Sequence, residues 1–224
     1  MTHIDEPRPR DVALLWKPID WPIRRTFAMR PSLVPPSALF SAVVEGRRSQ
    51  RHAARPSIGQ ALEVLQLSSK LHDGWNYQGI DRHHAPSVSA GGLHGIDLVL
   101  EAPVGRARLF RYDRQSNSLN ALNLADAMQL TELRCLIRQC LPSAQPIIVC
   151  LIADQSKYDA AYESSESLIW RDSGALLQII AMAAYALGFA ACVLGPHGKQ
   201  MVRALDLDSH RMMACGLIAI GKYS

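Results

Sequence analysis

Hydrophobic and polar residues alternate along this 224-residue chain with spacings typical of both helices and strands. Apolar positions recur at helical intervals in residues 37–45, 57–71, 124–140 and 168–187. Short apolar or alternating runs, which are typical of strands, occupy residues 96–100, 108–112, 119–122, 146–152 and 216–221. This mixture of elements predicts an α+β or α/β layered fold.

Several helix boundaries can be placed from residues with known capping preferences. Pro35 and Pro36 precede the first helix and Gly46 ends it, so the basic residues that follow are expected on a loop. Ser57 is a candidate N-cap for the second helix. Asp172 is expected near the start of the longest helix, where its charge favours the positive end of the helix dipole.

The segment 172–187 is apolar almost all round, which places it at the centre of the fold or at a subunit interface, and we favour both. Residues 73–95 hold six glycines or prolines and are expected to form a long loop or lid. This loop also carries His83, His84 and His94, but no carboxylate or cysteine completes a metal-ligand spacing. We therefore predict no metal site.

Composition indicates a protein with one globular core. With 48% hydrophobic and 20% charged residues, the chain can bury a substantial interior. Residues 1–33 are rich in proline and arginine and are expected to form an extended arm, which leaves residues 34–224 as the folded domain. No membrane span or secretion signal is recognised, so a cytoplasmic protein that does not enter membranes is expected.

Cysteine usage and charge narrow the functional classes. The five cysteines form no CxxC pair and lie mostly in apolar segments, which favours reduced thiols over disulfides or zinc. The net charge of +4 comes from the front of the chain. That basic region could bind nucleic acid, but it lacks interleaved aromatic residues, so we expect no nucleic-acid partner. A phosphate-bearing small molecule would need only a few of those arginines.

Three segments together resemble the nitroreductase-like flavoprotein superfamily, especially the branch of azoline-oxidising dehydrogenases of thiazole and oxazole peptide pathways. The run Arg-Arg-Ser-Gln-Arg at 47–51 is similar to the opening Arg-Arg-Ser-x-Arg of that family. Residues 89–97, Ser-Ala-Gly-Gly-Leu-His-Gly-Ile-Asp, resemble its Ser-Ala-Gly-Gly-Leu-His-Pro-Ile-Glu loop. Residues 184–195 resemble its Ala-Ala-x-x-Leu-Gly-Leu-Gly segment. The resemblance covers roughly residues 45–221.

This resemblance implies an α+β nitroreductase-like fold, with a central, mainly antiparallel sheet flanked by helices and the long buried helix at a dimer interface. It also implies FMN as the cofactor. The basic loop would grip the flavin phosphate and ribityl chain, the glycine loop would approach from the partner subunit, and the third segment would place backbone N–H groups near the flavin N5. The flavin-binding residues so implied are Arg47, Arg48, Ser49, Arg51, Ser89, Ala90, Gly91, Gly92, Val193, Leu194 and Gly195.

The activity implied is two-electron hydride transfer in a homodimer between flavin and NADH, NADPH or an organic substrate, which is a small molecule or derived from a peptide. Azoline-oxidising relatives are thought to use a lysine-tyrosine pair for the substrate proton, and Lys157, Tyr158 and Tyr162 lie in the corresponding region. Gly95 and Val88 stand where the family usually has proline. These departures keep open the alternative of a flavin-free scaffold or partner subunit in a biosynthetic complex. The resemblance to the azoline-oxidising branch keeps open a second alternative, an azoline dehydrogenase acting on a modified peptide.

Overall fold

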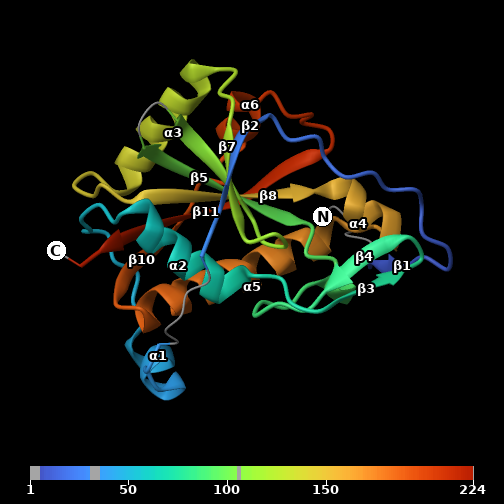
Figure 1. The fold of residues 1–224 in the computed structure, drawn as a ribbon, viewed down its shortest axis with the longest axis horizontal. Helices are drawn as coiled ribbons and strands as arrows, with labels where there is room; N and C mark the ends of the chain where they lie inside the picture. The colour runs from blue at the N-terminus through green and yellow to red at the C-terminus, as the bar shows by residue number, and fades with distance from the viewer. Residues whose placement is uncertain (1–5, 31–35, 105–106, 224) are drawn as a thin grey trace.

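A seven-stranded antiparallel sheet forms the centre of the protein (Figure 1), as seen in a computed structural model that describes residues 6–30, 36–104 and 107–223. The strand order is β10-β11-β8-β5-β6-β7-β2, and every neighbouring pair is antiparallel. The strands are β2 (Ile23–Ala28), β5 (Ile96–Val104), β6 (Ala107–Asp113), β7 (Ser118–Leu122), β8 (Ile147–Asp154), β10 (Phe189–Leu194) and β11 (Met212–Lys222).

Helices cover both faces of the sheet, and each face has its own apolar cluster. One cluster joins the sheet to α2 (Ile58–Ser69) and α5 (Glu166–Ala186). The other joins it to α3 (Ala127–Cys140) and α6 (Lys199–Ala204). All residues of β8 are buried, because this central strand has covered faces on both sides. These layers confirm the predicted α+β class with a central antiparallel sheet.

The helix boundaries follow local capping chemistry. Ser57 caps α2 as predicted, since its hydroxyl accepts from the Gln60 N–H at 3.2 Å while the Gln60 side chain accepts from the Ser57 N–H. Asp126 caps α3, which therefore begins after the expected residue 124. The first helix, α1 (Phe40–Gly46), is shorter than expected and includes Gly46 as its last residue.

The predicted loop at 73–95 is partly wrong, because it contains a two-stranded hairpin of β3 (Gly74–Tyr77) and β4 (Ile80–His83). Gln78 and Gly79 have positive φ angles of 53° and 80°, as a tight hairpin turn requires. The Asn76 side chain accepts from the Gly79 N–H at 3.0 Å and fixes this turn. A short 3₁₀ turn, η1 (Ala90–Gly92), follows the hairpin.

The described part of the N-terminal segment runs along the outside of the domain and joins the sheet. Its first strand, β1 (Arg8–Pro9), pairs with β9 (Tyr162–Glu163), and β2 pairs with β7 at the sheet edge. Between these strands the segment crosses α4 (Gln155–Ala161), where the Leu14 N–H donates to the Ala160 carbonyl at 2.9 Å. This route brings two tryptophans, Trp16 and Trp21, over the sheet.

Candidate functional site

The basic loop at 47–51 lies beside the outer strand β10. The Gln50 N–H donates to the Ala191 carbonyl at 3.0 Å, and Ser49 forms a parallel bridge with Ala191. Val193, Leu194 and Gly195 follow directly along the same edge, so the structure brings together two of the three segments singled out in the sequence.

The arginines of this loop differ in what they contact. Arg48 donates to the Glu45 and Arg47 carbonyls at 2.6 and 2.9 Å, so its guanidinium closes the carboxyl end of α1. Arg51 lies beside Cys192. Burial raises the pKa of the Cys192 thiol, and the positive charge of Arg51 offsets part of that increase. Among the described residues, no carboxylate pairs with Arg47, Arg48 or Arg51. Their positive charges are therefore available to an anion.

The glycine loop is held by one buried carboxylate in the body of α5. Asp172 accepts from the Ser89 hydroxyl at 2.5 Å and from the Ala90 N–H at 3.1 Å. Asp172 lies well inside α5, which begins at Glu166, so its predicted role at the helix start is wrong. The physical reason is that a buried carboxylate needs hydrogen-bond donors, and the glycine loop supplies them.

Two glycines of this loop adopt conformations that side chains rarely accept. Gly91 and Gly92 have φ angles of 52° and 73°. A Cβ on Gly92 would lie 2.9 Å from the Trp75 ring, so a larger residue would need both a strained backbone and a displaced ring. Glycine is required here for the close approach of the loop to the hairpin.

Tyr158 and Lys157 point to different environments. The Tyr158 hydroxyl is fully buried and donates to Asp172 at 2.8 Å, and burial followed by the nearby carboxylate raises its pKa well above the usual value. The Lys157 ammonium donates to the Leu93 carbonyl at 2.7 Å and lies 5.0 Å from the centre of the Trp16 ring. Burial, followed by the charge of Arg114, lowers the pKa of Lys157 to about 8.

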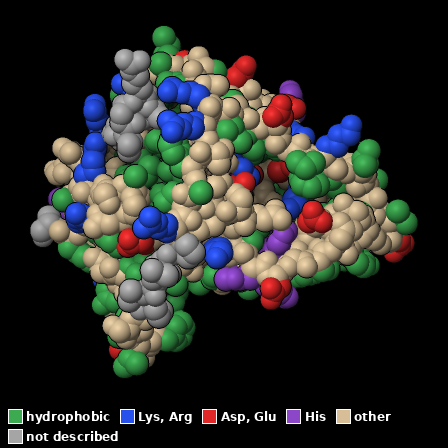
Figure 2. Space-filling model, in the orientation of Figure 1, with side chains coloured by type: hydrophobic (Ala, Val, Ile, Leu, Met, Phe, Trp, Pro, Cys, Tyr) green, Lys and Arg blue, Asp and Glu red, His purple; other side chains and the backbone are tan. Residues whose placement is uncertain are grey.

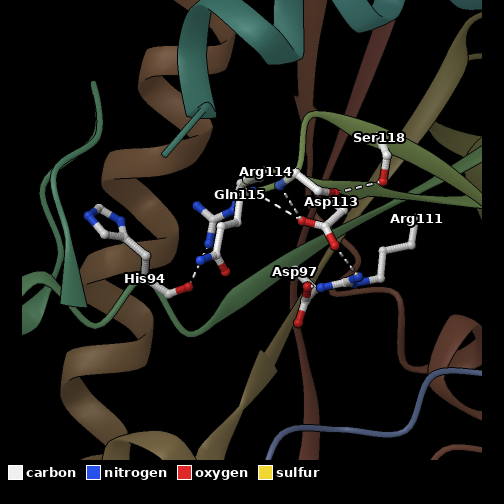
Figure 3. A network of polar contacts seen from close by, with 8 residues as sticks. His94, Asp97, Arg111, Asp113, Arg114, Gln115 and Ser118 are labelled. Carbon is white, nitrogen blue, oxygen red and sulfur yellow. Dashed lines mark hydrogen bonds and ion pairs between the residues drawn. The ribbon is translucent and has the colours of Figure 1, made fainter. Parts of the chain in front are cut away.

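Lys157 faces a cavity of about 350 Å³ between the N-terminal segment and the sheet. Arg114 lies deep beside it and donates to the His94 carbonyl at 2.5 Å (Figure 3). Burial, followed by the Arg114 charge, lowers the pKa of His94 to about 4, so this imidazole is neutral near pH 7. The cavity thus holds a lysine that can lose its proton at mildly basic pH.

A salt-bridge network forms another wall of the same cavity. Arg111 pairs with Asp97 at 2.8 Å and with Asp113 at 3.3 Å (Figure 3). Trp16 closes the cavity from the outside, where its indole N–H donates to Asp154 at 2.8 Å. No sequence motif indicates Arg114 or this cavity, because the N-terminal segment that covers the cavity is distant in the chain.

The glycine loop and the basic loop lie at opposite ends of α5 (Figure 1). Asp172, which holds the glycine loop, and Leu187, which follows the helix, are fifteen residues apart, or about 22 Å along the axis. In one copy of the chain the predicted flavin residues therefore form two separate groups. Within the described ranges no three metal-binding side chains gather, and no helix there is long and apolar enough to cross a membrane.

Comparison with solved structures identifies the fold. A Ralstonia eutropha JMP134 protein assigned as a nitroreductase matches with a TM-score of 0.65 and 17% identity, over 98% of this chain and 99% of that one. A protein assigned as a nitroreductase from Exiguobacterium sibiricum 255-15, in complex with FMN, matches with a TM-score of 0.55 and 15% identity, over 84% and 90% of the two chains.

A third similar structure is the Escherichia coli microcin synthetase McbBCD complex with truncated pro-MccB17 bound. It has a TM-score of 0.57 and 14% identity, over 90% of this chain and 79% of that one. No family model matches this sequence, and no curated protein matches it. The chain therefore has the nitroreductase fold, as the resemblance implied, and its activity has to be argued from its own residues.

Proposed function

We propose that this protein is an FMN-dependent oxidoreductase that works as a homodimer. The observation that carries the proposal is the contact of the basic loop with the edge strand β10, which brings Arg51 beside Cys192, while no carboxylate among the described residues pairs with Arg47, Arg48 or Arg51. Guanidinium forks suit the flavin phosphate, and the backbone N–H groups of Val193, Leu194 and Gly195 suit the ring edge. When bound, the flavin would supply two-electron hydride transfer.

The residues of this chain fit such a cofactor in two groups. Arg47, Ser49 and Arg51 would hold the phosphate end, while Arg48 would mainly close α1 through its two carbonyl contacts. The glycine loop, fixed by Asp172, would approach from the second copy. Four solvent-exposed apolar residues near this end of α5 support a covered surface in the dimer: Leu39, Phe40 and Val44 of the α1 region and Val193 of β10.

The first test is the absorbance spectrum of the purified protein after FMN is added and free flavin is removed. Retained flavin bands that NADH or NADPH bleaches would support a reductase. Bands that neither nucleotide bleaches would favour oxidation of an organic substrate. A protein that retains no flavin under any condition would contradict the proposal and would favour the alternative of a scaffold or partner subunit.

Arginine variants make this test specific to the predicted phosphate site. Arg47→Ala and Arg51→Ala should each weaken FMN retention by about tenfold or more, because one charge-assisted hydrogen bond contributes about 1.5–3 kcal/mol. Arg48→Ala should weaken it less, since its guanidinium already binds two carbonyls. Arg203→Ala, an exposed arginine on α6, is the matched control. Equal flavin affinity in all four variants would remove the phosphate assignment.

The second candidate is an azoline dehydrogenase acting on a modified peptide, and the position of Lys157 favours it. Oxidation of a thiazoline or oxazoline ring removes one hydride and one proton. Lys157 faces the cavity with a pKa of about 8, so its neutral form is accessible to accept that proton. Tyr158 is less suited because its hydroxyl is buried and bound to Asp172, and it would instead hold that carboxylate in place.

Lys157→Gln separates the two candidates. The variant should retain FMN in both cases, because Lys157 does not contact the basic loop. If the protein oxidises azoline peptides, this activity should fall at least about a hundredfold, the lower range for loss of a general base. Reduction by NADH or NADPH should be unchanged. Undiminished azoline oxidation in the variant would exclude Lys157 as the proton acceptor.

A further inference from the structure

A second cavity, of about 510 Å³, lies on the sheet face opposite α2 and α5. It is formed where the carboxyl end of α3 meets the ends of three neighbouring strands, β5, β6 and β8. Four arginines and a single acidic residue line it, together with apolar and small polar groups; its principal charged members are Arg55, Arg108, Arg134, Arg138 and Glu101.

The positive charge in this cavity is only partly neutralised. Arg134 binds Glu101, with its Nε donating to Oε1 at 3.1 Å, and both side chains are largely buried. Among the described residues, no carboxylate pairs with Arg55, Arg108 or Arg138. Three solvent-exposed guanidinium groups therefore line one open cleft without a carboxylate partner among the described residues. Like charges in one cleft repel each other, and a cleft of one sign concentrates ions of the other.

The helix dipole does not account for this arrangement. The carboxyl end of α3 carries about half a negative charge, which one arginine in the last turn, Arg138, is sufficient to offset. The remaining two arginines come from elsewhere in the chain. Arg108 lies on β6, and Arg55 lies beside the 142–146 loop, where the Gln145 N–H donates to the Ala53 carbonyl at 3.1 Å. The fold thus brings the charges together from separate segments.

Figure 2 shows Lys and Arg side chains along the left side of the molecule, where Figure 1 places α3, the loop that follows it and the segment that leads from α1 into α2. Of the flavin residues proposed above, the glycine loop packs against α5 on the opposite sheet face, and the basic loop lies at the β10 edge, where Arg51 is beside Cys192. The walls of the arginine-lined cavity also include apolar surface from Ile137, Ile148 and Pro146. A ligand could therefore combine several negative charges with a flat or apolar part.

We propose that this cavity binds a small molecule that carries two or more phosphate groups. Guanidinium groups match phosphate oxygens with paired N–H donors, and several of them are needed for a multiply charged anion. A ligand with a single carboxylate would neutralise only one of the three arginines that lack a carboxylate partner, so a multiply charged ligand fits the cavity better. The proposal does not depend on the flavin assignment, because none of its residues belongs to the basic loop at 47–51.

The test uses the full chain, with and without added FMN, and titrates pyrophosphate and ADP at constant ionic strength by isothermal titration calorimetry. With FMN bound at the basic loop, both ligands should bind one site per chain. If ADP binds more tightly than pyrophosphate, the apolar walls of the cavity contact the nucleoside. If the two affinities are equal, the site recognises the diphosphate group alone. Saturating FMN should leave either affinity unchanged, so failure of the flavin proposal would not affect the result.

Substitutions locate the binding within the cavity. Arg138→Gln and Arg108→Gln should each weaken pyrophosphate binding about tenfold, which corresponds to about 1.4 kcal/mol. Arg138→Lys should restore part of the affinity, because the charge remains while the guanidinium fork is lost. Arg171→Gln removes an exposed arginine from α5, on the other sheet face, and is the control. Thermal unfolding without ligand checks that each variant is folded.

Three results would overturn the proposal. One is the absence of pyrophosphate and ADP binding to the wild-type protein at millimolar concentrations. Another is binding that Arg171→Gln weakens as much as Arg138→Gln does, because this would indicate a general effect of surface charge. Retention of an oligonucleotide without any binding of pyrophosphate would also contradict a small-molecule site.

Discussion

Asp172→Asn tests whether one carboxylate holds the glycine loop against α5. Asp172 is buried, and its two oxygens accept from the Ser89 hydroxyl, the Ala90 N–H and the Tyr158 hydroxyl. Asparagine has the same shape but no charge. Hydrogen bonds to a charged group contribute about 1 kcal/mol more than neutral ones, so three weakened bonds would cost about 3 kcal/mol.

The smaller desolvation penalty of a buried amide, compared with a buried carboxylate, offsets part of this lost hydrogen-bond energy. We therefore expect the free energy of unfolding to fall by about 2 kcal/mol. Tyr158→Phe, which removes one donor and keeps the carboxylate, should lower it by about 1 kcal/mol. Urea unfolding followed by far-UV circular dichroism measures both changes.

The control for this experiment is Asp126→Asn at the N-cap of α3. Asn and Asp cap helices about equally well, so this substitution should change the free energy of unfolding by less than about 0.5 kcal/mol. Hydrogen exchange provides a local measurement, since the Ala90 amide should exchange faster in Asp172→Asn. Stability indistinguishable from the wild type, with unchanged exchange at Ala90, would refute the view that Asp172 anchors the loop.

Three further predictions concern other parts of the site. The pKa of His94 is about 4 in the folded protein and about 6.5 when unfolded, so the unfolded state binds more protons between these values and stability falls as the pH decreases from 6.5 to 4. Between pH 6.5 and pH 4, the free energy of unfolding should decrease by about 3 kcal/mol less in His94→Gln than in the wild type, measured by urea unfolding at both pH values. Trp16→Ala should expose Lys157 and move the midpoint of its acylation by an amine reagent from about pH 8 toward that of a free lysine. Phe40→Glu should reduce the dimer fraction in analytical ultracentrifugation, and an unchanged fraction would place the interface elsewhere.

The layered fold was predictable because its signals are local. The α2 cap at Ser57 and the buried strand β8 follow from capping preference and from an unbroken apolar run. The hairpin β3–β4 was missed, since its strands are only four residues long, β3 is exposed throughout, and its glycines resemble those of a loop. The contribution of β2 to the sheet was also missed, because a solvent-exposed edge strand shows no apolar alternation.

The candidate site was predictable only where a motif carried it. The basic loop and the end of β10 were both identified, but their contact through Ser49 and Ala191 is a long-range pairing that no spacing reveals. The predicted role of Asp172 was wrong because the sequence does not distinguish a carboxylate near a helix start from one inside the helix. Arg114 belongs to no motif, and its buried guanidinium donates to the carbonyl of His94, a residue with a positive φ angle of 44° that lies twenty positions earlier in the chain.

Helix α5 links the two groups of proposed flavin residues. In its second turn Asp172 holds the glycine loop, and in its last turn Tyr185 packs against Gly46, which leads directly into the basic loop. A helix of 21 residues is stiff, so the separation of the two groups is fixed rather than adjustable. Under the proposed function, a second copy must then bring its glycine loop to the basic loop of the first. Flavin retention and dimer formation should consequently be lost together, which is why a monomeric variant that still binds FMN tightly would contradict the homodimer and leave the basic loop assignment intact.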